Sequence, residues 1–301
     1  MINVLFDNVN FKSNSGPNGF AKKLIKALEK DCNIQTEISK NFIPDIQLSF
    51  ITSHYQYAPI VQRLDGIYFN IEQDFKSLNN SIRETYNSAA AAIFQSDFNK
   101  TLVENWFGKK EFTYVIRNGT DLDKISSIKE LSHPEINKFE NVWSTASSWR
   151  PHKRLGENIK YFMENASKND CLIIAGENPD VIISDPRIFY AGNLSWPDLI
   201  SLFKKSKYFI HLAWLDHCPN VVIDARASGC HIICSSSGGT KEIAGRNSTI
   251  IVEEEWDYSP IRLYNPLKMD FSKKEKCDIN SVIDIRKVAK EYYDIFKIVE
   301  I

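Results

Sequence analysis

Two aspartates, Asp216 and Asp224, have the residue type and the spacing of a ligand-binding pair. Asp216 ends an apolar run, and Asp224 follows after seven intervening residues, inside a helix predicted near Pro219–Ser228. The helix that starts just after Asp216 would point its first backbone N–H groups at the place that this carboxylate reaches. Carboxylates accept hydrogen bonds from hydroxyl groups, so the pair suits a hydroxyl-bearing ligand. The alternative interpretation is a charge at a helix N-terminus followed by a solvated helix residue.

A basic cluster follows the apolar run 142–146. It contains Arg150, Lys153 and Arg154. Cations gathered after a strand could bind an anionic ligand. A solvated basic turn is the alternative.

The region 205–245 resembles the donor-binding region of the retaining family 4 glycosyltransferases, which have the GT-B fold. It carries two acidic residues with seven between them, a small-residue stretch, a strand, and the turn Gly238-Gly239-x-x-Glu242. The family has glutamate at both acidic positions, so each aspartate here is one methylene shorter. The resemblance implies that Asp216 contacts the donor sugar and Asp224 the ribose. Further donor-binding residues on this basis are His217, Pro219 and Asn220.

The resemblance extends to the basic cluster and to two glycine-bearing turns. Lys153 aligns with the lysine that the family places on the donor diphosphate, whereas Ser148 stands where its arginine usually lies. Either Arg150 or Arg154 could substitute for that arginine. The implied catalytic residues are Lys153, Arg150 and Asp216, and Arg154 joins the donor-binding set. Gly192 and Asn193 are expected near the nucleobase, and Gly16 and Gly19 in a loop near the diphosphate.

Candidates on the acceptor side are fewer. His54 lies near the end of a predicted strand and is a candidate contact for the acceptor. Arg63 and Asp65 could face the cleft that the GT-B fold implies, or could simply pair with each other.

Short apolar runs alternate with amphipathic stretches along the chain, which is typical of βαβ units and parallel sheets. The predicted strands are 2–6, 46–51, 66–70, 91–95, 112–116, 142–146, 171–175, 188–191, 208–212 and 231–234. The predicted helices are 20–30, 58–64, 82–89, 99–106, 155–165, 196–204, 219–228, 240–244 and 282–301. We therefore expect an α/β protein with two Rossmann-like, doubly wound domains that face a cleft.

The domain boundary is predicted in the polar stretch that follows the Asn-Gly turn at residue 118. Residues 1–130 would form the acceptor-side domain and residues 131–281 the donor-binding domain. The C-terminal helix, about 282–301, is expected to pack back on the first domain.

Composition limits the partners. The 37 basic and 38 acidic residues give a net charge of −1, so no strong basic field would attract a nucleic acid. No apolar run approaches the roughly 20 residues that span a bilayer, and the N-terminus lacks the features of a signal peptide. The six cysteines lack a paired C-x-x-C spacing, which favours reduced thiols. A cytoplasmic protein is expected, with peripheral membrane association as an alternative.

By resemblance, the chain moves a sugar from a nucleoside-diphosphate sugar to an acceptor hydroxyl with retention at the anomeric carbon. The acceptor would be a glycan, a lipid-linked sugar or a small molecule. Neither a metal nor another cofactor is expected, because no Asp-x-Asp motif lies at a strand end. The alternatives are a GT-B nucleotide-sugar epimerase, a phosphorylase, and a non-catalytic protein that binds sugar-nucleotides or glycans.

Overall fold

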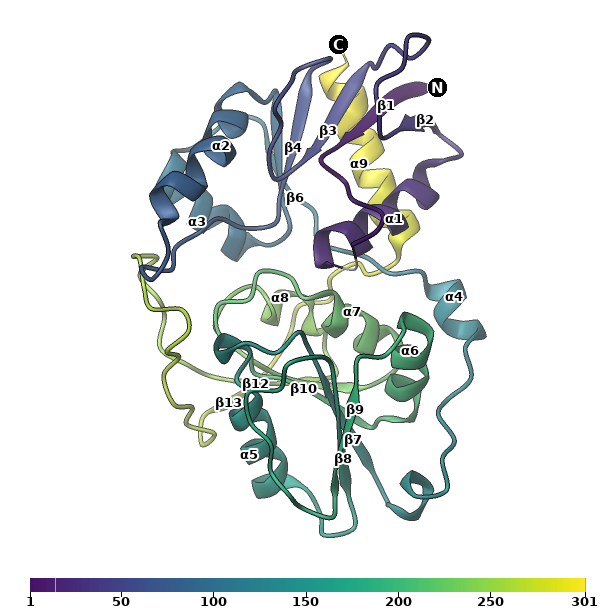
Figure 1. The fold of residues 1–301 in the computed structure, drawn as a ribbon, viewed down its shortest axis with the longest axis vertical. Helices are drawn as coiled ribbons and strands as arrows, with labels where there is room; N and C mark the ends of the chain where they lie inside the picture. Colours follow the sequence, from purple (N-terminus) through teal and green to yellow (C-terminus); the bar gives the residue numbers. More distant parts are fainter. Residues whose placement is uncertain (14, 301) are drawn as a thin grey trace. The chain divides into compact units, whose positions relative to one another are not determined.

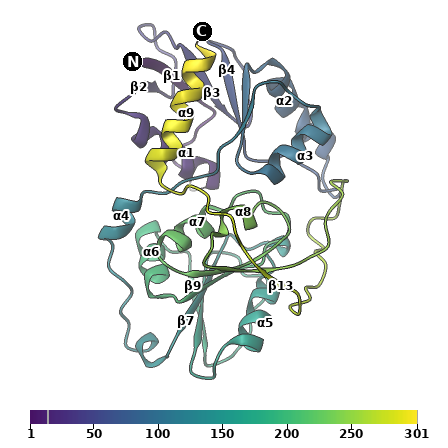
Figure 2. The ribbon, with the colours of Figure 1, turned by 180° about the vertical axis from the view of Figure 1, so that it is seen from behind.

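The computed structural model of this chain describes residues 1–13 and 15–300, which divide into two compact units (Figures 1 and 2). The first unit consists of Met1–Asp121, Tyr258–Ile261 and the C-terminal stretch from Val282. The second consists of Leu122–Asp257 and Arg262–Ser281.

The first unit ends earlier than residue 130, where the sequence analysis put the boundary. Residues Leu122–Ser127 form a helix, α4, rather than a linker, and this helix belongs to the second unit. Lys204 of the second unit donates a hydrogen bond to the carbonyl oxygen of Ser126 at 3.0 Å. The polar composition of this stretch concealed a short helix whose one buried side chain is Ile125.

Within the described residues, the first unit is built on a six-stranded sheet in the order β2-β1-β3-β4-β5-β6, and each pairing is parallel. Its strands are β1 (Ile2–Asp7), β2 (Cys32–Gln35), β3 (Ile46–Phe50), β4 (Ile60–Leu64), β5 (Ala91–Phe94) and β6 (Thr113–Val115). Its helices are α1 (Gly16–Leu28), α2 (Phe75–Ser88), α3 (Asp97–Phe107) and α9 (Ile285–Val299).

Helices cover both faces of this sheet. α1 and α9 lie side by side on one face, where apolar side chains of both helices join those of β1, β3 and β5 in one core (Figures 1 and 2). α2 covers the other face, because Gln62 of β4 donates to the carbonyl of Ile82 at 3.1 Å. The C-terminal helix thus completes the core of the first unit. It is described from Ile285 to Val299, and residue 301 lies outside the described residues.

Several predictions in this unit were wrong in type or in bounds, and α2 begins at Phe75 rather than at residue 82. The predicted helix 58–64 is strand β4, a buried run rich in β-branched residues that follows Pro59. The predicted strand 66–70 is irregular, because both backbone groups of Tyr68 bond to the side chain of Asn79 instead of a neighbouring strand. Helix α1 begins at Gly16 rather than residue 20, since Pro17 is well tolerated in a first turn. Strand β2 was not predicted.

The second unit contains a seven-stranded sheet among the described residues, in the order β13-β12-β11-β10-β7-β8-β9, with β13 alone antiparallel to its neighbour. Its strands are β7 (Val142–Ala146), β8 (Cys171–Ala175), β9 (Ile188–Gly192), β10 (Tyr208–His211), β11 (His231–Ser235), β12 (Ser248–Ile251) and β13 (Lys274–Lys276). Its helices are η1 (Ile136–Lys138), η2 (Pro151–Lys153), α4, α5 (Leu155–Asn165), α6 (Trp196–Lys205), α7 (Asn220–Ala227) and α8 (Lys241–Ala244).

The predicted strands and helices of this unit match closely, apart from α4, the 3-10 turns, β12 and β13, which were not predicted. α5 packs on one face of the sheet, where Trp143 and Phe162 meet at 5.8 Å between ring centroids. α6 packs on the other, where Phe203 meets Phe209 at 4.9 Å. The fold is therefore α/β with two Rossmann-like units, as the sequence predicted.

A buried arginine ties the first unit together. Arg63 of β4 is fully buried, pairs with Asp65, and donates to Asn118 Oδ1 at 2.6 Å and to the hydroxyl of Tyr292 in α9 at 3.1 Å. Its guanidinium also lies 4.3 Å from the ring centre of Phe20 in α1. One cation thus connects the sheet with both helices on its face.

We expect the Arg63→Met variant to lose about 3–5 kcal/mol of unfolding free energy, because the substitution leaves the Asp65 carboxylate buried without its partner. Urea unfolding measures the loss. The matched control is Arg83→Met on the exposed side of α2, which should change stability by less than about 0.5 kcal/mol. Equal, small losses in both variants would contradict the structural role of Arg63.

Candidate functional site

The candidate site forms where two neighbouring strands of the second sheet end. β7 and β10 pair in parallel, with β8 on the far side of β7 and β11 on the far side of β10. This is the point where the strand order reverses, and ligands of open α/β sheets bind outside the carboxyl ends of the strands there. The turn after β7 carries Lys153, and the loop after β10 carries Asp216.

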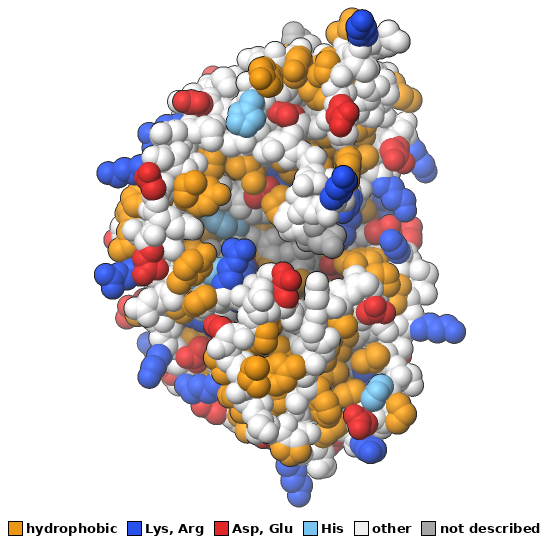
Figure 3. All heavy atoms as spheres, in the orientation of Figure 1, with side chains coloured by type: hydrophobic (Ala, Val, Ile, Leu, Met, Phe, Trp, Pro, Cys, Tyr) orange, Lys and Arg blue, Asp and Glu red, His pale blue; other side chains and the backbone are white. Residues whose placement is uncertain are grey.

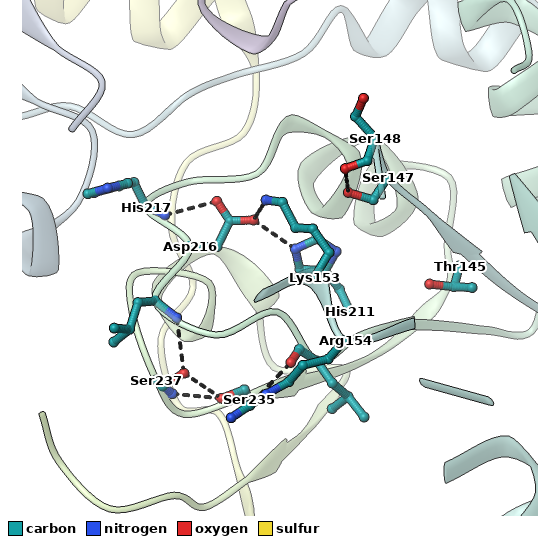
Figure 4. Close-up of polar contacts among 12 residues, drawn as sticks. Thr145, Ser147, Ser148, Lys153, Arg154, His211, Asp216, His217, Ser235 and Ser237 are labelled. Atoms are coloured by element: carbon teal, nitrogen blue, oxygen red, sulfur yellow. Dashed lines mark hydrogen bonds and ion pairs between the residues drawn. The ribbon is translucent and has the colours of Figure 1, made fainter. Parts of the chain in front are cut away.

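The two side chains meet in an ion pair (Figure 4). Lys153 Nζ lies 2.5 Å from Asp216 Oδ2, and Nε2 of His211, the last residue of β10, lies 3.0 Å from the same oxygen. The side chains of Lys153 and Asp216 are 18% and 14% exposed, so the pair is largely shielded but still reaches the surface. His217 adds a backbone N–H bond to Asp216 Oδ1 at 3.0 Å.

The charge state of this cluster follows from its surroundings. Burial would raise the pKa of Asp216, but the Lys153 ammonium and the hydrogen bond from His211 hold this pKa well below 3.8. Burial lowers the pKa of His211 despite its bond to Asp216. Burial also lowers the pKa of His152 to about 3, with help from the Lys153 charge, and that of His217 to about 4. Near neutral pH the site therefore holds an ionised carboxylate beside neutral imidazoles.

Backbone hydrogen bonds fix the approach of the two loops. The N–H of Trp214 donates to the carbonyl of His152 at 2.7 Å. The Asn158 side chain accepts from Leu212 N at 3.0 Å and donates to the carbonyl of Lys153 at 3.3 Å. These hydrogen bonds join the turn after β7 to the loop after β10, and the Lys153–Asp216 ion pair lies between these two segments.

The turn Gly238-Gly239 packs against the backbone of the loop that carries Asp216. Gly239 N donates to the carbonyl of Asp216 at 2.8 Å. Gly238 has φ +77°, and a Cβ on it would lie 2.5 Å from that same carbonyl oxygen. In this structure, the close approach that these glycines permit is to the backbone of Asp216.

Arg154 is buried inside the second unit, where it pairs with Glu253. It adopts the left-handed conformation, with φ 54°, and its side chain is 1% exposed. Its guanidinium grips both carboxylate oxygens of Glu253, at 2.8 and 2.9 Å. Glu253 in turn accepts a hydrogen bond from the hydroxyl of Ser235. The hydroxyls of Ser235 and Ser237 also lie within hydrogen-bond distance of each other (Figure 4).

That chain of contacts ends at the N–H of Leu215, which donates to Ser237 Oγ at 3.3 Å. Leu215 is left-handed, with φ 55°, directly before Asp216. Arg154 therefore supports the aspartate loop from inside the unit, and its contact with the donor stays a prediction. Arg150 lies exposed in the same turn as Lys153.

Asp224 lies in α7, as the sequence predicted, and is 3% exposed. The indole Nε1 of Trp196 donates to its Oδ2 at 2.9 Å. Pro219 precedes α7 and Asn220 is its first residue, so both lie between the two aspartates at the helix start.

Gly192 and Asn193 follow at the carboxyl end of β9, where both are exposed. Gly192 has φ 65° and its carbonyl accepts from Gly176 N at 2.7 Å. Lys153 follows β7, Asp216 follows β10 and Gly192 ends β9, so all three lie at the carboxyl edge of the second sheet.

The candidates of the first unit are not gathered in the same way. Arg63 and Asp65 pair with each other inside the unit, which settles the alternative left open by the sequence. The loop that carries His54 is fastened to β3, because the Gln47 side chain bonds the backbone of Tyr55 and Tyr57. His54 is exposed in this loop, and its contact with the acceptor stays a prediction. Gly16 and Gly19 lie in the first turn of α1 rather than in a loop.

Several supporting residues were missed by the sequence analysis. His211 was not among the candidate residues, although its place five residues before Asp216 could have marked it. Glu253 and Trp196 carried no signal, since Glu253 follows the unpredicted β12 and Trp196 looked like an ordinary helix start.

Other properties of the described residues bear on possible partners. In ranges 1–13 and 15–300, no three His, Cys, Asp or Glu side chains cluster as a metal site, and no helix has the length and apolar character of a bilayer span. On the face drawn in Figure 3, basic and acidic side chains are interspersed. The six cysteines are buried free thiols.

Comparisons with known proteins agree with this geometry. Residues 135–259 match the family model Glycosyl transferases group 1. No curated protein sequence matches the chain.

Solved structures with a similar fold cover nearly the whole chain. Anabaena Alr3699/HepE, solved with UDP, has a TM-score of 0.67 at 13% identity over 99% of this chain and 100% of that one. A sucrose-phosphate synthase from Thermosynechococcus elongatus has a TM-score of 0.62 at 10% identity over 100% and 96%. A glycosyltransferase from Rickettsia africae has a TM-score of 0.58 at 16% identity over 99% and 98%.

At these identities the structural likeness establishes the fold, and the family match locates the domain. Residues 135–259 are similar to the Glycosyl transferases group 1 family, and the chain has the GT-B fold, with two Rossmann-like units.

Proposed function

We propose that this chain is a glycosyltransferase that moves a sugar from a nucleoside-diphosphate sugar to an acceptor hydroxyl, with retention and without a metal ion. The observation that carries the proposal is the Lys153–Asp216 ion pair at the reversal point of the second sheet. A glycosyltransferase donor presents a diphosphate and a sugar side by side, and a cation next to a carboxylate matches both parts.

In the proposed reaction Lys153 binds the donor diphosphate and Asp216 binds sugar hydroxyls. The bond between the anomeric carbon and the phosphate oxygen breaks, and the acceptor oxygen bonds to the same face of that carbon. The acceptor proton passes to an oxygen of the leaving diphosphate. The lysine ammonium stabilises the negative charge that grows on this group.

The likeness to Anabaena Alr3699/HepE, solved with UDP and with UDP-glucose, makes a uridine donor the first one to test. The acceptor would be a glycan, a lipid-linked sugar or a small molecule. We also expect a cytoplasmic site of action.

Binding without turnover is a second candidate function. Arg154 is committed to Glu253, so of the three basic residues in the turn after β7 only Lys153 and Arg150 are left for a diphosphate. A site with fewer cations on the leaving group would bind a nucleotide-sugar yet transfer it slowly.

The first test is thermal-shift binding with UDP-, GDP- and ADP-sugars. We expect one of them to raise the midpoint of the wild-type chain, and Lys153→Ala to weaken its binding roughly 10- to 150-fold, since a hydrogen bond to a charged group is lost. Lys168→Ala, an exposed lysine at the amino end of β8, is the matched control and should bind as the wild type does. If no nucleotide-sugar binds at millimolar concentration, the donor site does not exist.

Transfer assays then separate the two candidate functions. A product that forms with the anomeric configuration of the donor, in the presence of EDTA, supports the retaining, metal-independent reaction. Binding with no transfer to any acceptor of a broad panel favours the binding protein.

The substitution Asp216→Asn should act in opposite directions on nucleotide and on transfer. Removal of the carboxylate frees Lys153 from its partner, so UDP alone should bind as tightly as before or tighter. Sugar transfer should fall by a factor of about 100 or more, because the sugar hydroxyls lose a charged acceptor. Isothermal titration with UDP and a transfer assay measure the two effects. Parallel losses of UDP affinity and transfer would contradict this division of roles.

The proposed charge state predicts how stability depends on pH. His152, His211 and His217 have pKa values below the usual 6.5 in the folded chain, so the unfolded chain binds more protons once the pH falls under about 6.5. Stability is fully present above that pH and falls on acidification by up to about 4 kcal/mol per pH unit for three protons. The lowered pKa of Asp216 adds a further loss below about pH 3.9.

Urea unfolding at pH 7.5 and 5.5 tests this dependence. His152→Gln should reduce the slope by about a third, because one of the three neutral imidazoles is gone. The control His133→Gln, at an exposed position, should leave the slope unchanged. Stability that is constant between the two pH values would rule out neutral imidazoles in the folded site.

A further inference from the structure

The indole of Trp196 links two parts of the proposed donor site. Trp196 is the first residue of α6, three positions after Asn193, and its Nε1 donates to Asp224 Oδ2 at 2.9 Å. The loop that follows β9 is therefore fastened to the carboxylate in α7.

The indole itself is held in place. Ser195 caps α6 by accepting from Asp198 N at 3.3 Å, which fixes the backbone that carries Trp196. Lys124 of α4 places its ammonium 5.1 Å from the centre of the Trp196 ring, within cation–π range. The donor of the hydrogen bond is thus oriented by contacts on both its backbone and its ring.

The carboxylate has little freedom to choose another direction. Asp224 is 3% exposed, so hydrogen bonds rather than water decide where its oxygens point. An indole N–H can only donate, which leaves the carboxylate an acceptor for hydroxyl groups. A vicinal diol needs an acceptor held in one orientation, since both hydroxyls must align with it.

We propose that Trp196 is a positioning residue that holds the Asp224 carboxylate for the ribose diol, so that the preference for ribose over 2′-deoxyribose depends on this indole. The inference rests on the proposed function and on the predicted contact of Asp224 with the ribose of the donor.

The chain offers a matched control for this hydrogen bond. Trp143, the second residue of β7, donates from Nε1 to Asp170 Oδ2 at 3.0 Å, and Asp170 directly precedes β8. The bond has the same chemistry but lies at the amino ends of the strands. Trp143→Phe therefore removes an equivalent bond at the opposite end of the sheet from Asp216.

The test is isothermal titration of the full chain with UDP, GDP and ADP and with their 2′-deoxy counterparts. For the nucleotide that binds, Trp196→Phe should weaken the ribose form roughly tenfold and the deoxy form much less. The ratio of the two affinities should fall toward one. Trp143→Phe should lower the melting temperature and leave the ratio at its wild-type value.

Asp224→Asn, alone and combined with Trp196→Phe, gives a second measurement. If the indole acts through the carboxylate, the double variant should show the same ribose preference as Asp224→Asn alone. This comparison also applies if Trp196→Phe is less stable, since each ratio is measured within one variant.

The outcomes that overturn the proposal are distinct from failure of the proposed function. A wild-type ratio in Trp196→Phe, or an equal fall of the ratio in Trp143→Phe, shows that the indole does not position Asp224. A wild-type chain that binds none of the three nucleotides shows instead that the donor site is absent, and the inference fails with it.

Discussion

The order of strands in the second sheet decides where the chemical groups of this protein lie. β7 and β10 are neighbours, although β8 and β9 lie between them along the chain. Parallel strands end at the same edge, so the turn after β7 and the loop after β10 must meet there. Lys153 and Asp216 are in contact because of this adjacency, and β11 and β12 bring Ser235 and Glu253 to the same edge.

The same edge must also hold charges that are largely out of water. Asp216 has a cation and a neutral imidazole on one oxygen and a backbone N–H on the other. Further inside the unit, Arg154 and Glu253 form a second ion pair, in which the arginine is buried. Breaking such a pair by removing one partner costs about 3–5 kcal/mol. One ion pair, Arg154–Glu253, thus supports the loop, and another, Lys153–Asp216, supplies the charges at the surface of the site. Because they are separate, Lys153–Asp216 can rearrange while Arg154–Glu253 stays in place.

The sequence predicted the fold class and most elements of the second unit. It also predicted that one aspartate follows a strand and that a second lies within the next helix. These features depend on local periodicity and on motifs within a short stretch. It failed where the decisive contact was distant in the chain. The run 58–64 was predicted as a helix, yet it pairs in parallel with β3 and β5, and its polar side chains Gln62 and Arg63 find buried partners.

Contacts of the site residues escaped the sequence for the same reason. The ion pair of Arg154 was not foreseen because its partner, Glu253, lies far along the chain beyond an unpredicted strand. Trp196 attracted no notice because its bond to Asp224 joins separate βα units. Side chains within one loop can be assigned from sequence, whereas their partners across a sheet require its strand order.

The two units use similar sheets for different purposes, and exposure distinguishes them. In the first unit Arg63 is fully buried, and its donors serve Asp65, Asn118 and Tyr292 of its own fold. In the second, Lys153 retains 18% exposure beside Asp216. A partly exposed ammonium can exchange a carboxylate for an incoming phosphate at little cost, because water and ligand reach it directly. A guanidinium enclosed in a core could do so only by opening that core, so Lys153 is the better placed of the two cations to meet a phosphate.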